Sequence, residues 1–432
     1  MLIQDLYTIF LQYSSIQTDT RKLRPGDLFF ALKGPNFNGN QFAEQALEGG
    51  AAYAIIDEPV NFMDDRLIHT AGVLPTLQDL AKYHRRQFGI PFLAITGSNG
   101  KTTTKELVNE VLSRNYKTYT TKGNLNNHIG VPLTILSVKK DAEMAVIEMG
   151  ANHQKEIEGY CQYTMPTHGI ITNCGKAHLE GFGSEEGVRK GKGELFDYLR
   201  TNGGTVFIMN DYEYLKEMSI GIPEVVTYGT GIADIAGDAD KTAEFLQVEM
   251  TRGTGLKKIK TNLVGEYNLP NILAAVAVGK YFKVPDEAIK NALENYTPSN
   301  SRSQLIEKGS NKIILDAYNA NPTSMKAAIE NFVKMKGADK ILLLGAMMEL
   351  GEESIREHSA IVKLIDQYSW KSVVLVGEDF VKTRHGYLHF PNSAEARDWL
   401  NQQHFENTKM LVKGSRSMQM EKVLEDPPIT AG

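Results

Sequence analysis

Short runs of consecutive apolar residues recur along the chain, and between them lie longer segments in which apolar residues return every three or four positions. The first pattern is typical of strands buried on both faces, and the second of helices that cover a sheet. In the middle of the chain, strands are predicted at 92–95, 144–147, 169–172 and 205–209, and helices at 103–114, 185–199 and 268–282. The alternation restarts further on, with strands at 312–317, 340–345, 372–377 and 409–414 and helices at 323–335, 353–368 and 393–402. This alternation indicates α/β domains with mostly parallel sheets.

Two breaks divide the pattern into three predicted domains. Before the central alternation, the chain holds strand-like runs at 26–32 and 51–56 and a helical stretch at 42–48. The polar run Pro298, Ser299, Asn300 and Ser301 is typical of a linker. We therefore expect domains at 1–88, 89–297 and 298–432. The last lacks G-x-G-x-x-G, so a dinucleotide is not expected there.

Composition narrows the class of protein. A chain of 432 residues with 42% hydrophobic and 23% charged residues is typical of a globular protein with more than one domain. The net charge of −5 offers no general attraction for nucleic acid or an anionic membrane. No apolar run approaches the ~18 residues of a membrane span, and the N-terminus lacks the basic start of a signal peptide. Cys161 and Cys174 form no metal-like or redox-like pair, so we expect reduced thiols and a cytoplasmic location.

The stretch FLAITGSNGKTTT at 92–104 is the most informative for chemistry. It keeps the G-x-x-G-K-T part of a phosphate-binding loop, although the longer usual pattern is incomplete. Lys101 would reach the β- and γ-phosphates, and the Thr102 hydroxyl would bind Mg²⁺. A strand before the loop and a helix after it favour nucleotide binding over an ordinary glycine turn.

Three further polar residues are candidates for the same site. Glu148 ends the run MAVIEMG, and ligands of α/β sheets bind beyond the carboxyl ends of strands. A carboxylate that faces a phosphate loop there favours a role in Mg²⁺ binding. His178 follows the strand GIITN at 169–173, where pattern alone favours a surface or capping histidine. For Lys192, in RKGKGELF, pattern alone favours a solvated helix lysine.

Two asparagine-rich segments leave alternatives open. Asn268 and Asn271 lie at the start of a helix rich in small residues, where they could cap the helix or reach an adenine. Asn124, Asn126 and Asn127 lie in one loop, where turn chemistry and recognition of a polar substrate are both compatible with the sequence.

Taken together, the strings TGSNGKTTT, IEMGA, NCGKAHLEGFGS, KGKGELF, GEYNLPN and DAYNANPTSM resemble, in this order, the Mur ligase family over essentially the whole chain. The resemblance implies an ATP-dependent ligase with three α/β domains. These would be a small N-terminal UDP-substrate domain, a central P-loop ATPase-type domain with a parallel or mixed sheet, and a C-terminal Rossmann-like domain. Folylpolyglutamate synthases share the last two domains, but their phosphate loop lies nearer the N-terminus.

Within that family, three segments point to the member that joins D-alanyl-D-alanine to UDP-N-acetylmuramoyl-tripeptide in peptidoglycan synthesis. They are TDTRKLRPGDLFFALKG at 18–34, DAYNANPTSM at 316–325 and LGAMMELGEES at 344–354. The resemblance implies an acyl-phosphate intermediate, and we expect a monomer. The alternatives are another amino-acid ligase of the family, a non-catalytic nucleotide-binding regulator, and a P-loop kinase.

The resemblance also implies roles for individual residues, with ATP and two Mg²⁺ ions as cofactors. The expected metal ligands are Thr102, Glu148, His178 and a carbamylated Lys192 (N6-carboxylysine), and the expected catalytic residues are Lys101, Glu148, His178 and Lys192. The expected ATP-binding residues are Gly97, Ser98, Asn99, Gly100, Lys101, Thr102, Thr103, Asn268, Asn271, Arg302, Asp316 and Asn319. The expected substrate-binding residues are Thr20, Arg21, Asn38, Asn126 and Asn127.

Three positions depart from the family pattern. Tyr267 and Asn40 stand where many relatives have histidine, and Ala346 stands where many have aspartate. None of these departures removes the phosphate loop, Glu148, His178 or Lys192.

Overall fold

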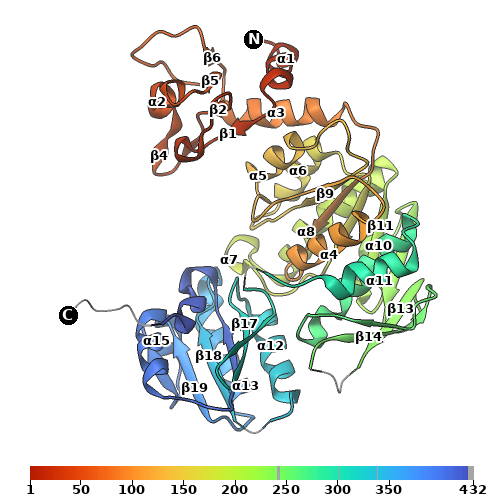
Figure 1. The fold of residues 1–432 in the computed structure, drawn as a ribbon, viewed down its shortest axis with the longest axis vertical. Coiled ribbons are helices and arrows are strands. Elements are labelled where there is room, and N and C mark those ends of the chain that lie inside the picture. Colours follow the sequence, from red (N-terminus) through yellow and green to blue (C-terminus); the bar gives the residue numbers. More distant parts are fainter. Residues whose placement is uncertain (241–243, 300, 338, 427–432) are drawn as a thin grey trace.

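Three lobes, each built on its own sheet, follow one another along the chain and form a crescent (Figure 1). The computed structural model describes residues 1–240, 244–299, 301–337 and 339–426. We call the lobes the N lobe (α1 to β6), the central lobe (β7 to α11) and the C lobe (β16 to η6). The predicted three-part α/β architecture is confirmed, and within the described residues no helix is long and apolar enough to cross a membrane.

The N lobe contains a four-stranded parallel sheet in the order β1-β2-β5-β6. Its elements are α1 (Ile3–Tyr13), β1 (Ile16–Gln17), η1 (Thr20–Lys22), β2 (Leu28–Phe30), β3 (Lys33–Gly34), β4 (Phe37–Asn38), η2 (Gly39–Phe42), α2 (Ala43–Glu48), β5 (Tyr53–Ile56) and β6 (Leu67–His69). Side chains of β2 alternate between faces, so Phe29 packs with α2 while Leu28 and Phe30 join the main core. Both strands and the helix predicted in this region are present, each shorter than predicted.

Helix α3 (Val73–Arg85) follows the N-lobe sheet but packs on the central lobe. It contacts α1 on one side, and α5 (Gly130–Leu136) and α6 (Glu156–Thr164) on the other. His84 Nε2 lies 2.7 Å from the Val138 carbonyl oxygen, and Arg85 Nε donates to the Thr164 carbonyl oxygen at 2.9 Å. Burial lowers the pKa of His84, which favours the neutral ring. The two lobes are therefore joined by a packed helix as well as by the chain.

The central lobe holds a nine-stranded mixed sheet in the order β15-β14-β13-β12-β11-β10-β7-β9-β8. Its strands are β7 (Phe92–Thr96), β8 (Thr118–Thr120), β9 (Met144–Glu148), β10 (His168–Ile171), β11 (Thr205–Met209), β12 (Glu224–Gly229), β13 (Ile235–Ala239), β14 (Gln247–Arg252) and β15 (Lys258–Lys260). Strand β7 is completely buried and lies between β9 and β10, parallel to both. The carboxyl ends of these three strands therefore meet at one edge of the sheet.

Helices cover both faces of this sheet. They are α4 (Lys101–Leu112), α7 (Leu179–Phe182), α8 (Glu185–Asn202), α9 (Glu213–Ser219), η3 (Glu266–Asn268), α10 (Leu269–Tyr281) and α11 (Asp286–Asn295), together with α5 and α6. The predicted helices match α4, α8 and α10 within three residues at each end. Cys161 and Cys174 are buried free thiols, as expected from the sequence.

The C lobe contains a six-stranded sheet in the order β16-β17-β21-β18-β19-β20, parallel except for β16. Its elements are β16 (Gln304–Lys308), β17 (Asn311–Asp316), α12 (Pro322–Lys334), β18 (Lys340–Gly345), η4 (Gly351–Glu353), α13 (Ser354–Ile365), β19 (Ser372–Val376), α14 (Glu378–Val381), β20 (Leu388–Phe390), α15 (Ser393–Gln402), β21 (Lys409–Lys413), η5 (Arg416–Met418) and η6 (Met420–Leu424). Each predicted strand and helix of this region has a counterpart. In the predicted linker, Asn300 lies outside the described residues.

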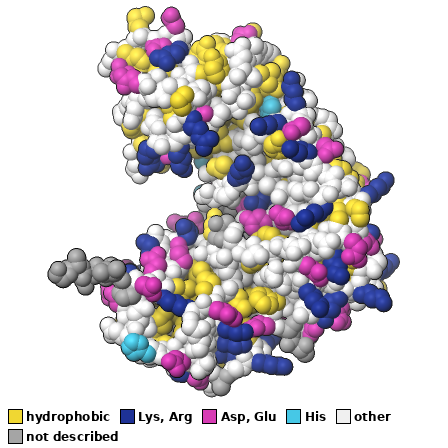
Figure 2. All heavy atoms as spheres, viewed as in Figure 1, with side chains coloured by type: hydrophobic (Ala, Val, Ile, Leu, Met, Phe, Trp, Pro, Cys, Tyr) yellow, Lys and Arg dark blue, Asp and Glu magenta, His cyan; other side chains and the backbone are white. Residues whose placement is uncertain are grey.

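The surface is hollowed between the N lobe and the C lobe, and the central lobe forms the back of this opening (Figure 2). Lys and Arg side chains gather along the N-lobe rim of the opening. A positively charged rim favours the approach of an anionic ligand.

Candidate active site

The phosphate-loop sequence forms a tight turn between β7 and α4. Gly97 and Gly100 have φ values of +141° and +81°, which favour glycine. A Cβ atom at Gly97 would lie 2.0 Å from Thr172 Oγ1, and one at Gly100 would lie 2.6 Å from Asn271 Oδ1. Both glycines are therefore required by their neighbours, and the predicted order of strand, loop and helix is present.

The end of β10 fastens this loop in place. Asn173 accepts from Ser98 N through its carbonyl oxygen at 2.8 Å and from Asn99 N through Oδ1 at 3.1 Å. The Thr172 hydroxyl donates to the Asn99 carbonyl oxygen at 2.6 Å. Sequence reasoning did not single out Thr172 or Asn173, although both follow the strand next to the loop.

Lys101 is the first residue of α4, and its ammonium folds back over the loop. Nζ donates to the carbonyl oxygens of Gly97 at 2.6 Å and Ser98 at 3.2 Å. Desolvation lowers the pKa of Lys101 to about 8; the charge of Arg302 acts in the same direction and that of Glu148 opposes it. An anion bound at the phosphate loop would therefore stabilise the charged form of Lys101.

Glu148 is buried beside the start of α4. Its Oε1 accepts from Thr102 Oγ1 at 3.0 Å and from Asn126 Nδ2 at 2.8 Å. Its Oε2 is buried and has no hydrogen-bond partner among the residues that the structure describes. A buried carboxylate oxygen without a partner is costly unless a cation or donor joins it. The hydroxyl and carboxylate oxygens of Thr102 and Glu148 suit Mg²⁺, which prefers hard oxygen ligands.

Lys192 lies on α8 and is completely buried. Its Nζ donates to the Ala151 carbonyl oxygen at 2.8 Å and lies 5.0 Å from the centre of the Phe182 ring. Desolvation, together with the smaller effect of the nearby charge of Lys101, lowers the pKa of Lys192 to about 7. This lysine is not the solvated residue that the local pattern favoured, because the helix turns it into the lobe.

His178 precedes α7 and contacts the C lobe. Its Nδ1 lies 2.6 Å from Glu349 Oε2, and this contact holds the pKa of Glu349 below its usual range. Throughout the part of the chain that the structure describes, no three His, Cys, Asp or Glu side chains form a group that could hold a metal ion. Mg²⁺ commonly completes its coordination with water and substrate phosphates, so Thr102 and Glu148 still fit a nucleotide-bound ion.

Asn268 and Asn271 are buried at the start of α10 and link it to the phosphate-loop helix. Asn271 Nδ2 donates to Asn268 Oδ1 at 3.0 Å, while Thr104 Oγ1 donates to Asn271 Oδ1 at 3.0 Å. Asn268 Nδ2 also donates to the Val264 carbonyl oxygen at 2.9 Å. Neither side chain caps α10; Asn271 lies directly behind Gly100 of the phosphate loop, and Asn268 holds Asn271.

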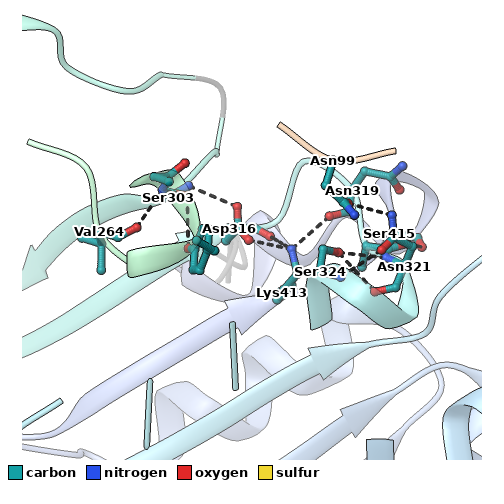
Figure 3. Close-up of polar contacts among 12 residues, drawn as sticks. Asn99, Val264, Ser303, Asp316, Asn319, Asn321, Ser324, Lys413 and Ser415 are labelled. Atoms are coloured by element: carbon teal, nitrogen blue, oxygen red, sulfur yellow. Dashed lines mark hydrogen bonds and ion pairs between the residues drawn. The ribbon is translucent and has the colours of Figure 1, made fainter. Parts of the chain in front are cut away.

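Arg302 lies just before the C lobe, and the C lobe holds the ion pair of Asp316 and Lys413 (Figure 3). The Arg302 guanidinium stacks 3.5 Å from the centre of the Tyr318 ring, and within the described part of the chain its buried Nε has no hydrogen-bond partner. Asp316 accepts from Ser303 N at 3.2 Å and from Lys413 Nζ at 2.6 Å. Lys413 is buried and was not singled out from the sequence.

Three further residues that the sequence singled out, Asn319, Tyr267 and Ala346, have the following surroundings. Asn319 has an exposed side chain, and its carbonyl oxygen accepts from Lys413 at 3.2 Å. The hydroxyl of Tyr267 lies 3.2 Å from Ser303 Oγ, so this departure from the family pattern contacts the linker. Ala346 is buried at the end of β18.

The expected substrate residues occupy two separate places. Asn127 Oδ1 accepts from Gly130 N, at the first residue of α5, at 2.8 Å, whereas Asn126 contacts Glu148. Thr103 lies buried in the first turn of α4. Thr20 and Arg21 form part of η1 in the N lobe, where Arg21 is exposed and pairs with Asp19 at 2.8 Å.

Asn38 and Asn40 form part of a polar cluster in the N lobe. Asn38 Nδ2 donates to Glu58 at 2.6 Å, and Asn40 Nδ2 donates to Asp57 at 2.9 Å. Asn40 is buried and also accepts from Asp57 N at 3.0 Å. The amide at position 40 thus holds two segments of the lobe together.

A phosphate loop at the carboxyl ends of parallel strands in a central mixed sheet, faced by an arginine that precedes a following α/β lobe, defines a class of three-lobed nucleotide-binding proteins. The chain belongs to the Mur ligase family. The family model for the Mur ligase family, catalytic domain, matches residues 12–93; the Mur ligase middle domain matches 95–279; and the Mur ligase, glutamate ligase domain, matches 301–416.

Individual relatives resemble the chain along almost its whole length. The UDP-N-acetylmuramoyl-tripeptide–D-alanyl-D-alanine ligase of Bacillus subtilis is 34% identical and covers 95% of this chain, which covers 92% of that relative. The crystal structure of MurF from Acinetobacter baumannii has a TM-score of 0.86 and 31% identity, covering 95% of this chain and 92% of its own. The MurF ligase of Thermotoga maritima in complex with ADP has a TM-score of 0.86 and 26% identity, covering 95% of this chain and 96% of its own.

Proposed function

We propose that this chain is an ATP-dependent ligase that joins D-alanyl-D-alanine to UDP-N-acetylmuramoyl-tripeptide. The products are UDP-N-acetylmuramoyl-pentapeptide, ADP and inorganic phosphate. The observation that carries the proposal is the phosphate loop, with Thr102 beside an unpaired oxygen of Glu148. The names of the relatives that cover 95% of the chain support the choice of substrates.

The chemical problem is to form an amide from an unreactive carboxylate. The terminal carboxylate of the tripeptide attacks the γ-phosphorus of ATP, so a new P–O bond forms as the bond to ADP breaks. The amine of D-alanyl-D-alanine then attacks the acyl-phosphate carbon. The tetrahedral intermediate expels phosphate, and the nitrogen loses a proton as the amide forms. Catalysis of the first step consists mainly of positioning and charge stabilisation.

The residues around the phosphate loop are suited to that task. The N-terminus of α4 and the Lys101 ammonium offer positive charge to the β- and γ-phosphates. Arg302 would add a second cation from just before the C lobe, and its buried Nε, which has no partner among the described residues, is available for an anion. Asn268 and Asn271 would support the loop from behind, while Asp316 and Asn319 lie on the C-lobe side.

Thr102, Glu148, His178 and Lys192 would hold two Mg²⁺ ions, which neutralise charge where carboxylate and triphosphate meet. Lys192 fits carbamylation because burial lowers its pKa to about 7 and so supplies a neutral amine. In that modification the amine attacks CO₂, a C–N bond forms and a proton is released. The resulting carbamate gives Lys192 the oxygen atoms that Mg²⁺ prefers.

The lobes divide the work in this proposal. Thr20, Arg21 and Asn38 in the N lobe would bind the UDP-linked substrate, and Asn126 and Asn127 would face its peptide end. The C lobe would close over both substrates and exclude water, which protects the acyl-phosphate from hydrolysis. Because ATP and nucleotide-linked precursors are cytoplasmic metabolites, we propose a cytoplasmic location; that the chain is a monomer stays a prediction.

The test is phosphate release from ATP and Mg²⁺ with UDP-N-acetylmuramoyl-tripeptide and D-alanyl-D-alanine each omitted in turn. We expect release only when both are present, with the UDP-pentapeptide seen by mass spectrometry. Lys101→Ala, which removes the phosphate-loop cation, is the negative control and should lose about 10³-fold in kcat.

Other outcomes would identify other functions. Release with a different acceptor would keep the family and change the substrate. Tight ATP binding without release in any combination would favour a non-catalytic nucleotide-binding protein. A stable phosphorylated product without an amide would indicate a kinase.

A further inference from the structure

Asn321 ends the loop between β17 and α12 and uses the two ends of its side chain for different partners. Its Oδ1 accepts from Ser324 N at 2.9 Å, which caps α12. Its Nδ2 donates to Asn99 Oδ1 in the phosphate loop at 2.8 Å. Asn321 is 8% exposed, and the two side chains face one another across the lobe boundary (Figure 3). One residue therefore both starts a C-lobe helix and contacts the loop of another lobe.

The Asn99 side chain depends on this contact. The backbone N–H and carbonyl of Asn99 are already bonded to Asn173 and Thr172 of the central lobe. Its Oδ1 accepts from Asn321, whereas its Nδ2 is buried without a partner among the described residues. The orientation of this side chain is consequently set from the C lobe.

A second contact lies two residues beyond the first. Lys176 N, in the segment after β10, donates to Thr323 Oγ1 at 3.0 Å. That segment also fastens the phosphate loop, since Ser98 Oγ donates to the Gly175 carbonyl oxygen at 2.8 Å. The N-terminus of α12 thus contacts the phosphate loop both directly, at Asn99, and through its support at Lys176.

We propose that Asn321 is a positioning residue that couples docking of the C lobe to nucleotide binding at the phosphate loop. The inference rests on the proposed function only in taking the loop to bind ATP and ADP. When the lobe is docked, the Asn321 amide holds Asn99 and the loop in their nucleotide-binding arrangement. By linkage, nucleotide binding favours the docked lobe to the same extent.

A matched control separates this role from helix capping. Asn392 caps α15 in the same lobe: its Oδ1 accepts from Glu395 N at 3.0 Å, and its Nδ2 donates to Glu395 Oε1 at 2.8 Å. Serine is a good N-cap, so both Asn321→Ser and Asn392→Ser keep the cap and lose the amide donor. Only Asn321→Ser removes a contact with the phosphate loop.

The first experiment is calorimetric titration of the two full-length variants with ADP and Mg²⁺. One neutral hydrogen bond corresponds to about a fivefold change in affinity, so we expect Asn321→Ser to bind ADP about fivefold more weakly. Asn392→Ser should bind ADP as the unmodified chain does, and thermal unfolding of both variants should be alike. Equal ADP affinity for the two variants would overturn the proposal.

The second experiment is a double-mutant cycle with Asn99→Ala. If Asn321 acts through Asn99, the double variant should bind ADP no more weakly than Asn99→Ala alone. Strictly additive losses would contradict the coupling. ADP binding does not depend on the identity of the ligase substrates, so failure of the phosphate-release assay would overturn the proposed function without affecting this result.

Discussion

Two lysines near the phosphate loop are placed for different chemistry. Lys101 keeps its ammonium bonded to loop carbonyls, with a pKa lowered to about 8. Lys192 is completely buried, with a pKa lowered to about 7. About half of a group with that pKa is neutral near pH 7, and only the neutral amine can react with CO₂. A conventional lysine would be almost entirely charged under the same conditions.

Replacement of Lys192 by alanine should lower kcat by about 100-fold or more, because the proposed carbamate, which would hold Mg²⁺, can no longer form. Added formate or acetate should restore part of the activity by supplying a carboxylate in its place. Steady-state phosphate release with and without the acid measures both effects. Lys190→Ala, an exposed lysine on the same helix, is the control and should retain full activity. Full activity of Lys192→Ala without added acid would remove Lys192 from the mechanism.

Residues with a local signature were predictable, and residues defined by contacts between distant segments were not. The loop from Gly97 to Thr103 follows from glycine chemistry next to a buried strand. Lys192 looked like a surface lysine because helical spacing does not show what covers a helix. Asn321 and Lys413 escaped notice because their partners, Asn99 and Asp316, are distant in sequence.

At the scale of elements, the loop between β17 and α12 is held by Lys413, the last residue of β21. Lys413 is 2% exposed, and Nζ bonds to the Asp316 carboxylate at 2.6 Å and to the Asn319 carbonyl oxygen at 3.2 Å. The same loop ends at Asn321, which caps α12. One buried cation therefore fixes the path of a loop that connects a strand to a helix.

Lys413→Met should destabilise the C lobe by about 3 kcal/mol, because it leaves the Asp316 carboxylate without its partner. Adding Asp316→Asn should recover part of that loss, since an amide is less costly to leave unpaired than a charge. Urea unfolding monitored by circular dichroism measures both changes. Lys422→Met, at an exposed lysine of the same lobe, should change stability by less than about 0.5 kcal/mol. If the double variant were no more stable than Lys413→Met, the ion pair would not explain the loss.

Strands at the middle of each sheet were easier to predict than those at the edges. Strand β7 is buried on both faces and reads as an uninterrupted apolar run. Strands β14 and β15 alternate polar residues with single apolar ones such as the buried Val248 and Ile259, so no continuous apolar run marks them. The packing of α3 on α5 and α6 was also not predicted, because an amphipathic pattern does not show which helices its apolar face contacts.

At the scale of the whole molecule, the opening between the N lobe and the C lobe is the largest feature of the surface in Figure 2. The packed helix α3 joins the first two lobes, whereas the linker around Ser299 and Ser301 precedes the C lobe. Ser301 and Ser303 have φ values of +56° and +48°, which are strained for residues other than glycine. Rotation at this linker is the simplest way to narrow the opening.

Binding of a non-hydrolysable ATP analogue together with UDP-N-acetylmuramoyl-tripeptide should reduce the radius of gyration, because the C lobe rotates toward the N lobe. Small-angle X-ray scattering of the free and liganded protein measures this change. Lys101→Ala with the same ligands should stay near the free value, since it lacks the phosphate-loop cation. An unchanged radius in the unmodified protein, at ligand concentrations shown to saturate it, would contradict closure at the linker.

The position of α3 sets limits on how chains of this family could recombine. The matches to the first two family models meet near residue 94, which makes that point look like a clean crossover site. A crossover there would set a foreign α3 against the resident Val138 and Thr164 carbonyl oxygens, which His84 and Arg85 contact in this chain. Exchange just before Ser301 would leave α3 with its own partners, although it would cut through contacts such as those of Asn321 with Asn99 and of Thr323 with Lys176. We therefore expect viable chimaeras to take the first two lobes together from one parent chain and the last lobe from the other.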